Sequence, residues 1–301
     1  MGRAVFAALL LALLTACSDG GRVDDAAREP AATPSTSASP SGSASTAPEV
    51  ELSEPPSRSG RSRSGPRLDT WELGSRTLPL RPDGFGQVRR TPEQLRVRRM
   101  PTITNLPDPE GERFTASVRR ITPWVRGRMG SSWERGCPVG LRDLRYLQVT
   151  FWGFDERPHR GELIVHEDHA RGVVGVFRKL YGARFPIEQM TLPTSTKRDP
   201  TPSGDGNGTG AMVCRATTGQ TFWSAHALGL AIDLNPFQNP YKRGDLVIPE
   251  RASAYLDRSW QRPGMIRRGG LVVRAFREIG WSWGGSWTSL KDDQHVSANG
   301  R

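Results

Sequence analysis

Two of the five histidines in this 301-residue chain lie in segments whose side chains could form a metal site. A catalytic zinc ion takes three protein ligands, from histidine and carboxylate side chains, and leaves a fourth position for water. It also needs a nearby carboxylate that accepts the proton of that water. His226, Asp233 and His295 supply the three ligands, and Asp292 or Asp293 supplies the base. These residue types therefore predict a catalytic zinc centre.

The spacing of seven between His226 and Asp233 restricts the element that carries them. On a helix the two side chains would share one face, whereas on a single regular strand they would point to opposite faces. Gly229 and the apolar run at 230–232 instead favour a turn after His226, followed by a short buried strand that carries Asp233. The third ligand, His295, must reach this strand from the far end of the chain.

The elements around these residues predict an α+β fold. Residues 145–152 alternate apolar and polar side chains, which predicts a half-buried strand, and residues 162–166 predict a second strand. A helix follows, for which Asp168 is the expected N-cap and Gly182 the stop, and another helix is predicted at 271–279. Because strands and helices do not alternate regularly, α+β is favoured over a parallel α/β sheet.

Two motifs, in the right order along the chain, carry a specific resemblance to a known family. The first is Ser-x-His-x-x-Gly-x-Ala-x-Asp at 224–233, followed by Asn-Pro-x-x-Asn-Pro-Tyr at 235–241. The second is Trp-Gly-Gly-x-Trp at 283–287, leading into Asp-x-x-His at 292–295. Together they resemble the M15 metallopeptidases, which include D-Ala-D-Ala carboxypeptidases and L-alanyl-D-glutamate endopeptidases. The similarity extends from about Trp124 to the C-terminus.

The resemblance implies a fold and a ligand set. It implies a small antiparallel sheet flanked by helices, of the D-Ala-D-Ala peptidase/hedgehog-like type, that holds one zinc ion per chain. It assigns His226, Asp233 and His295 as the zinc ligands. It also selects Asp292, three residues before the last histidine, as the general base instead of its neighbour Asp293.

The resemblance further implies roles for residues that line the site. In the family an arginine at the position of Arg215 helps to polarise the scissile carbonyl and to stabilise the oxyanion, and Trp223 and Ser224 are expected to contact the substrate. The chain departs from the family after the last histidine, where Val296 replaces the usual aromatic residue. We expect this change to loosen the wall beside the metal.

The activity implied by the resemblance is zinc-dependent hydrolysis of an amide bond in peptidoglycan stem peptides, by metal-activated water with Asp292 as general base. Carboxypeptidase and endopeptidase cleavage both remain open because they use the same ligands. A basic pocket around Arg215 that receives a terminal carboxylate favours the carboxypeptidase. The alternatives are a non-catalytic wall-binding lipoprotein that keeps the fold and a zinc-storage protein, although neither a ligand nor the base is missing from the sequence.

The first residues predict export. Residues 1–16 contain Arg3 and then an apolar run at 4–14, which is too short to remain as a membrane-spanning helix and is typical of a signal peptide. The sequence at 14–17, Leu-Thr-Ala-Cys, resembles a lipobox and predicts lipidation of Cys17. The alternative is an ordinary secretory signal followed by an incidental cysteine.

Composition divides the rest of the chain. Residues 17–65, which begin with the cysteine proposed for lipidation, are rich in Ser, Thr, Pro and Ala and predict a disordered linker. Residues 66–123 form an N-terminal extension of unassigned role, and 124–301 form the zinc peptidase domain.

Charge and cysteine content indicate the partners and the compartment. The net charge of +11 is spread along the chain, which suits anionic wall polymers or lipid headgroups, and export argues against nucleic acid. Once Cys17 is lipidated, Cys137 and Cys214 remain as an even pair and predict a disulfide, with two buried thiols as the alternative. We expect a monomer that is anchored to the membrane through Cys17.

Two further groups of residues have both structural and functional interpretations. Three histidines form a cluster in sequence that could be a second metal site, but we expect their rings not to converge: His159, His166 and His169. Three tryptophans could stack on glycans, but packing beneath the site is favoured: Trp281, Trp283 and Trp287.

Overall fold

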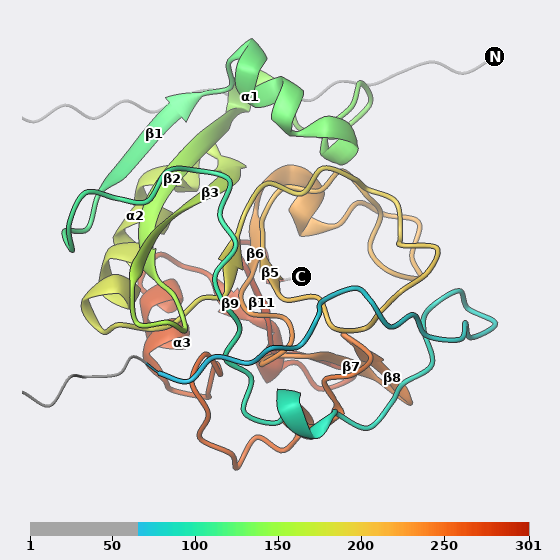
Figure 1. Ribbon diagram of the computed structural model, residues 1–301. Coiled ribbons are helices and arrows are strands. Elements are labelled where there is room, and N and C mark those ends of the chain that lie inside the picture. The colour runs from blue at the N-terminus through green and yellow to red at the C-terminus, as the bar shows by residue number, and fades with distance from the viewer. Residues whose placement is uncertain (1–65, 301) are drawn as a thin grey trace, which may run out of the picture. The chain divides into compact units, whose positions relative to one another are not determined.

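The computed structural model describes residues 66–300, shown in colour in Figure 1. The signal peptide predicted at 1–16, the lipidation of Cys17 and the linker predicted at 17–65 lie outside the described residues. Among the described residues, no helix has both the length and the apolar character needed to cross a bilayer.

The largest sheet is antiparallel, with the strand order β1-β2-β3. Its strands are β1 (Ala116–Arg120), β2 (Leu144–Trp152) and β3 (Pro158–His166). The sequence predicted β2 as half-buried, but both of its faces are covered. Val149 and its neighbours on one face pack against α2, whereas Tyr146 on the other face packs in a separate apolar cluster with Val125. The alternating pattern therefore predicted the wrong burial for β2, because the strand is central and has neighbours on both faces.

Helices cover this sheet, as Figure 1 shows. Helix α2 (Glu167–Gly182) packs on β2 and also contacts α3 (Leu271–Arg277), and α1 (Pro123–Arg128) lies beyond the other face. The predicted cap of α2 is wrong: His166 is the N-cap, and its ring Nδ1 accepts the backbone N–H of Asp168 at 3.4 Å. Asp168 lies within the first turn instead, where its negative charge is favourable. Helix α2 ends at Gly182 as predicted.

The strands that carry two predicted ligands and the predicted base form two smaller antiparallel sheets. One has the order β6-β11-β9, and the other has the order β10-β7-β8. A parallel pair, β4 with β5, completes the strands of the described residues. Their bounds are β4 (Gln189–Met190), β5 (Gly208–Thr209), β6 (Ala231–Asp233), β7 (Tyr241–Arg243), β8 (Leu246–Ile248), β9 (Ser282–Trp283), β10 (Lys291–Asp292) and β11 (His295–Ser297).

Short 3-10 turns connect these elements. Two of them border the predicted site, Ala225–Leu228 and Gly284–Ser286. The others described are Glu93–Leu95, Gly130–Ser132, Leu141–Asp143 and Ser253–Leu256. The prediction of a mixed α+β fold with small antiparallel sheets and few helices is confirmed.

One apolar core supports both the large sheet and the predicted site. Ile232 and Leu234, which flank Asp233, are fully buried in the same cluster as Val149 of β2 and Phe177 of α2. The side of β6 that faces away from the ligands is thereby fixed in the interior. Because protein interiors are close-packed, this anchoring limits movement of the ligand-bearing strand.

The segment predicted as an N-terminal extension packs onto the rest of the described chain. Strand β1 pairs with β2, and Leu95 and Met100 are buried with Phe237 and Tyr255. A fully buried ion pair joins Arg98 to Glu188, with 2.6 Å between guanidinium and carboxylate atoms. The described residues accordingly form one compact unit.

The predicted disulfide is present. The sulfur atoms of Cys137 and Cys214 are 1.97 Å apart, which confirms the pairing. The backbone N–H of Cys214 also donates to the carbonyl of Ser132 at 2.8 Å. The residue that follows the second cysteine is Arg215, so the covalent link holds the base of the segment that carries this arginine.

Candidate metal centre

The turn expected after His226 is a 3-10 turn that leads directly into β6. Ser224 caps it, because its Oγ accepts the backbone N–H of His226 at 3.3 Å. Gly229 ends the turn in the left-handed region, with φ of 67°, and its carbonyl accepts the N–H of His166 at 2.9 Å. A side chain at Gly229 would lie 2.7 Å from that nitrogen, so only glycine allows the chain to turn here. Asp233 then ends β6 as predicted.

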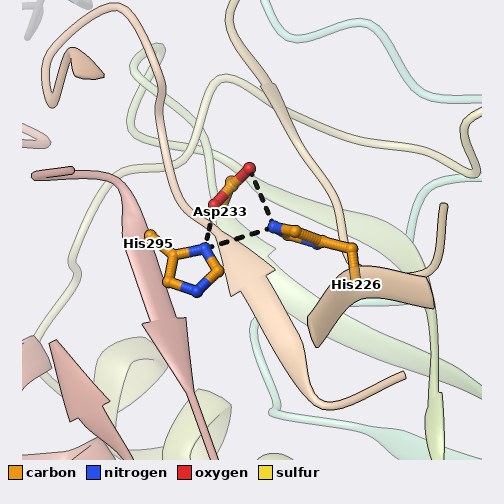
Figure 2. Close-up of side chains that lie close together, drawn as sticks. All are labelled: His226, Asp233 and His295. Carbon is orange, nitrogen blue, oxygen red and sulfur yellow. Dashed lines mark hydrogen bonds and ion pairs between the residues drawn. The ribbon is translucent and has the colours of Figure 1, made fainter. Parts of the chain in front are cut away.

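Antiparallel pairing brings the third predicted ligand to the second. In the register of β6 with β11, His295 stands opposite Asp233. Their side chains emerge on the same face, and the ring of His226 approaches from the preceding turn (Figure 2). The centre is thus assembled from one turn and two paired strands, and its three residues are called the metal centre below.

The donor atoms of the metal centre lie at distances that suit one ion. Nε2 of His226 lies 3.2 Å from an oxygen of Asp233 and 3.2 Å from Nδ1 of His295, which in turn lies 3.1 Å from the other oxygen of Asp233. Tetrahedral zinc with bonds of about 2.0–2.1 Å has ligand atoms about 3.3 Å apart. Among the described residues, these three form the group of histidine, cysteine and acidic side chains that could hold a metal ion. The donor set therefore fits zinc.

A backbone contact orients the first histidine. Nδ1 of His226 lies 2.6 Å from the carbonyl oxygen of Ala211, and because a carbonyl only accepts, the proton resides on Nδ1. Nε2 is then left with its lone pair directed at the centre. Such an outer hydrogen bond fixes the tautomer and ring orientation of a metal-binding histidine.

The charges of the centre suit a cation. Burial alone would raise the pKa of Asp233, but the facing charges and hydrogen bonds of His226 and His295 outweigh it and lower this pKa below its ordinary value. Asp233 is thus an ionised carboxylate between two imidazoles, which are themselves 4% and 5% exposed. An anionic carboxylate beside two buried imidazole rings suits a positive ion.

The two candidate bases border different cavities, Asp292 at the end of β10 and Asp293 directly after it. Asp292 borders the same cavity as the metal centre, and its buried Oδ1 has no hydrogen-bond partner among the described residues. Asp293 instead lies 3.5 Å from the guanidinium of Arg258 and borders a different cavity. Burial, reinforced by the negative charge of Asp233, raises the pKa of Asp292 to about 7. A carboxylate with a pKa near neutrality and an unused oxygen suits a general base.

The two glycines of the Trp-Gly-Gly motif have a steric explanation. A Cβ on Gly284 would lie 2.7 Å from the backbone oxygen of Asp292 and 3.3 Å from Cβ of His295. A Cβ on Gly285 would lie 2.5 Å from a carboxylate oxygen of Asp293. The motif thus allows one segment of backbone to pack closely against the strands that present the base and the last ligand.

A cavity of about 620 Å³ opens beside the metal centre, and we call it the front pocket. Its wall combines arginine with aromatic side chains, and the residues that matter here are Arg215, Phe222, Tyr241, Arg243 and Trp287. The ring centres of Trp287 and His295 are 5.4 Å apart. Phe222 is 49% exposed on the rim. A polar metal centre at one end and apolar walls around it are typical of a small-ligand site.

The residues predicted to contact substrate have different positions. Arg215 and Ser224 both line the front pocket, and the backbone N–H of Ser224 donates to the carbonyl of Arg215 at 3.1 Å. Trp223 is 48% exposed, is bridged to Ala216 and is not among the residues that line this pocket. The roles assigned to these three residues remain predictions.

The expectation for Val296 is wrong. Val296 is fully buried in the main apolar core, because it pairs with Ile232 on the face of β11 opposite to His295. Side chains alternate along a strand, so the residue after a ligand cannot line the same wall. The smaller side chain therefore changes the core and not the pocket.

The histidine cluster and the three tryptophans are arranged mostly as predicted. Both ring nitrogens of His159 face carboxylates, Asp108 and Asp155, at 3.0–3.2 Å, and the ring centres of His166 and His169 are 6.4 Å apart. Trp281 and Trp283 are buried in the core, whereas Trp287 lines the front pocket.

Sequence reasoning missed part of the wall of the front pocket. Tyr241 was noted only as the end of a motif, and no role was predicted for Arg243. Both lie on β7, where Tyr241 pairs with Asp292. The period-two spacing of 241 and 243 could have predicted that the two side chains share a face, but not which face.

Comparison with known proteins agrees with the geometry. Residues 217–298 match the profile of the family described as D-alanyl-D-alanine carboxypeptidase. The matched range includes the whole metal centre and Asp292, and the resemblance to the M15 peptidases that the motifs predicted is confirmed. No curated protein matches the chain, and no solved structure matches it either.

Proposed function

We propose that this M15 peptidase domain uses one zinc ion to hydrolyse an amide bond in peptidoglycan stem peptides. The observation that carries the proposal is the convergence of zinc-type donors from three residues, with 3.1–3.2 Å between the nearest donor atoms of each pair, at the wall of a cavity that also holds the unpartnered carboxylate oxygen of Asp292. The family match supports peptide-bond hydrolysis. We also propose that the fold is of the D-Ala-D-Ala peptidase/hedgehog-like type.

Each of these residues of the front pocket has a separate role in the proposed reaction. A zinc ion held by His226, Asp233 and His295 would supply Lewis acidity and lower the pKa of a coordinated water. Asp292 accepts the proton of the attacking water and returns it to the leaving amine. Arg215 donates hydrogen bonds to the carbonyl oxygen as negative charge develops there, because a guanidinium presents its donors in a fixed geometry.

We favour carboxypeptidase cleavage over endopeptidase cleavage. Arg215 and Arg243 both line the front pocket, and neither has an acidic partner among the described residues. Two uncompensated guanidinium groups favour a substrate that ends in a carboxylate beside the scissile bond. An endopeptidase substrate would place a continuing chain at that end of the cavity.

The protein is proposed to act outside the cytoplasm. The disulfide between Cys137 and Cys214 is typical of an oxidising compartment, and peptidoglycan stem peptides lie beyond the membrane. Lipidation of Cys17 and a monomeric state remain part of the proposal.

Mass spectrometry of purified muropeptides tests the activity and identifies the bond. We expect the wild type to remove the terminal residue of a pentapeptide stem, and Asp292→Ala to leave the substrate intact. Asp293→Asn is the matched control, since that neighbouring carboxylate faces away from the front pocket. Cleavage within the stem would favour the endopeptidase, and equal products from the wild type and Asp292→Ala would refute the catalytic role of Asp292.

Metal analysis separates the enzyme from a binding protein. We expect one tightly held zinc ion per chain in the purified protein. A protein that neither contains stoichiometric zinc nor cleaves muropeptides would be a wall-binding relative that keeps the fold.

A further inference from the structure

A second cavity, of about 530 Å³, lies next to the catalytic strands and is strongly basic. Its wall contains five cationic side chains and one carboxylate: Lys242, Arg258, Arg267, Arg268, Lys291 and Asp293. We call this cavity the basic pocket. Asp293 is 5% exposed and lies 3.5 Å from Arg258, so the carboxylate is matched by one of the five cations. The remaining four positive charges have no acidic partner among the residues that line it.

The basic pocket and the front pocket are separated by the pair of strands β7 and β10. Alternation along β7 directs Tyr241 and Arg243 to the front pocket and Lys242 to the basic pocket. Along β10, Asp292 borders the front pocket and Lys291 the basic pocket. One thin wall thus presents the proposed base on one side and lysines on the other.

Two lysines of this wall lie close enough to repel each other, which a bound anion would relieve. Lys242 and Lys291 stand directly opposite each other in the antiparallel register. Like charges in such a cross-strand pair destabilise the sheet. The ammonium of Lys291 donates to the carbonyl of Trp287, which orders the side chain but does not neutralise it. Arg267 and Arg268, both exposed, add further positive charge at the rim.

We propose that the basic pocket binds phosphodiester groups of an anionic polymer of the cell envelope. Arginine and lysine together suit phosphate, since guanidinium binds its oxygens in bidentate fashion and ammonium acts as a point charge. Leu256, Ile266 and Trp283 line the same cavity and supply an apolar surface for the carbon backbone between charges. Binding at this face would hold the peptidase on its wall substrate with the front pocket still open.

A polymer suits the basic pocket better than a membrane surface. Stable insertion into the interface uses exposed apolar side chains beside the charges. The large exposed apolar residues of the described chain are elsewhere: Leu80, Val97, Ile103, Val118, Trp124, Phe222 and Trp223. None of them lines the basic pocket.

Binding of a fluorescently labelled glycerol phosphate polymer, measured by anisotropy, tests the proposal. The test variant is Arg267→Glu with Arg268→Glu, and the matched control is Arg119→Glu with Arg120→Glu, an exposed arginine pair on β1. Each double variant lowers the net charge from +11 by four, to +7. All proteins carry Cys17→Ser so that no lipid contributes. We expect the affinity of the test variant to fall by about tenfold or more and that of the control to change less than about twofold.

The outcomes distinguish binding at the basic pocket from attraction by the net charge of the protein. Equal losses in the two double variants, or no binding by the wild type, would overturn the proposal. Stronger binding to vesicles that contain phosphatidylglycerol than to the polymer, lost in the test variant alone, would overturn it in favour of a membrane site.

Hydrolysis of a soluble stem peptide keeps this result separate from the proposed enzyme function. We expect the test variant to cleave the soluble peptide at the wild-type rate, which also shows that it is folded. The binding measurement stands whether or not any protein hydrolyses the peptide, so the two proposals fail independently.

Discussion

The protein buries charged groups in two places, which differ in how completely these groups are hydrogen-bonded. In the first, Arg98 and Glu188 are fully buried, and we call them with Asn207 the arginine cluster. One oxygen of Glu188 accepts from the guanidinium at 2.6 Å, and the other accepts from it at 2.7 Å and from Asn207 at 2.6 Å. Arg98 also donates to the carbonyl of Asp205 at 2.8 Å. Protein atoms alone complete this cluster.

The metal centre differs because it lies beside a buried polar atom that has no partner. His226 and His295 lie 3.2 Å apart through their ring nitrogens, and each lies within 3.2 Å of one oxygen of Asp233, whereas the nearby Oδ1 of Asp292 is buried without a partner among the described residues. Unsatisfied buried polar atoms are costly, and native proteins retain them where a ligand or a reaction uses them. In this molecule the arginine cluster, which is fully hydrogen-bonded, is expected to serve stability, whereas the unpartnered oxygen of Asp292 is available for a reaction.

Removal of a ligand from the metal centre is expected to have the largest effect. Asp233→Asn keeps the shape of the side chain but removes the anionic donor. We expect hydrolysis to fall by at least about 10³-fold, because the loss of metal forfeits several kcal/mol of transition-state stabilisation. Zinc should then no longer raise the melting temperature, as it does for any protein whose folded state alone binds it. A variant with full zinc content and activity would show that Asp233 is not a required ligand.

Disruption of the arginine cluster should act on stability instead. In Glu188→Ala the buried guanidinium loses its counter-ion, and we expect the free energy of unfolding in urea to fall by about 3–5 kcal/mol. The folded fraction should keep its zinc.

The double variant Arg98→Met with Glu188→Met sharpens this test. Replacing both partners by apolar side chains removes the unpaired charge, so we expect it to cost less than the single variant. If the double variant is the less stable of the two, the cluster contributes more than mutual neutralisation.

Loss of the disulfide is expected to have an intermediate effect. The cysteines are 77 residues apart, and we expect Cys137→Ser with Cys214→Ser to lower the free energy of unfolding by about 2–4 kcal/mol. Because Cys214 precedes Arg215 and no ligand follows for another eleven residues, hydrolysis should decrease more than zinc content does. Parallel loss of zinc and activity would show that the link also holds the metal centre.

The smallest predicted effect concerns pH and Asp292. Its pKa in the folded, metal-free protein is raised to about 7 from 3.8, so the folded state holds this proton more tightly than the unfolded state does. This carboxylate therefore costs stability that grows as pH rises from about 4 to about 7 and is constant above. We expect Asp292→Asn to stabilise the zinc-free protein, in urea unfolding, by about 2–3 kcal/mol more at about pH 8 than at about pH 5. A pH-independent difference would contradict the raised pKa.

Local patterns in the sequence were sufficient for several elements. The turn at Gly229 and the strand that ends in Asp233 followed from one glycine and a short apolar run, because backbone conformation there depends on adjacent residues. The end of α2 at Gly182 was predicted for the same reason. Its start was not, since His166 caps the helix in place of the expected Asp168.

Other features depended on partners that are remote in the chain. Arg98 and Glu188 are 90 residues apart, and no local pattern marks them as a pair. The position of Val296 in the core and of Arg243 in the front pocket depends on which face of a strand is covered. Periodicity predicts that side chains share a face, but packing decides what that face meets.

Residue types and short spacings were enough to predict the candidate metal ligands, the disulfide pair and the resemblance to the M15 peptidases. The residue types left Asp292 and Asp293 open as the base, and the resemblance alone selected Asp292. The tertiary structure adds that Asp292 borders the cavity beside the candidate ligands, that two arginines line the same cavity and that a basic cavity lies behind the same strands. These relations arise from the antiparallel pairing of β7 with β10 and β6 with β11, which joins residues far apart in the chain.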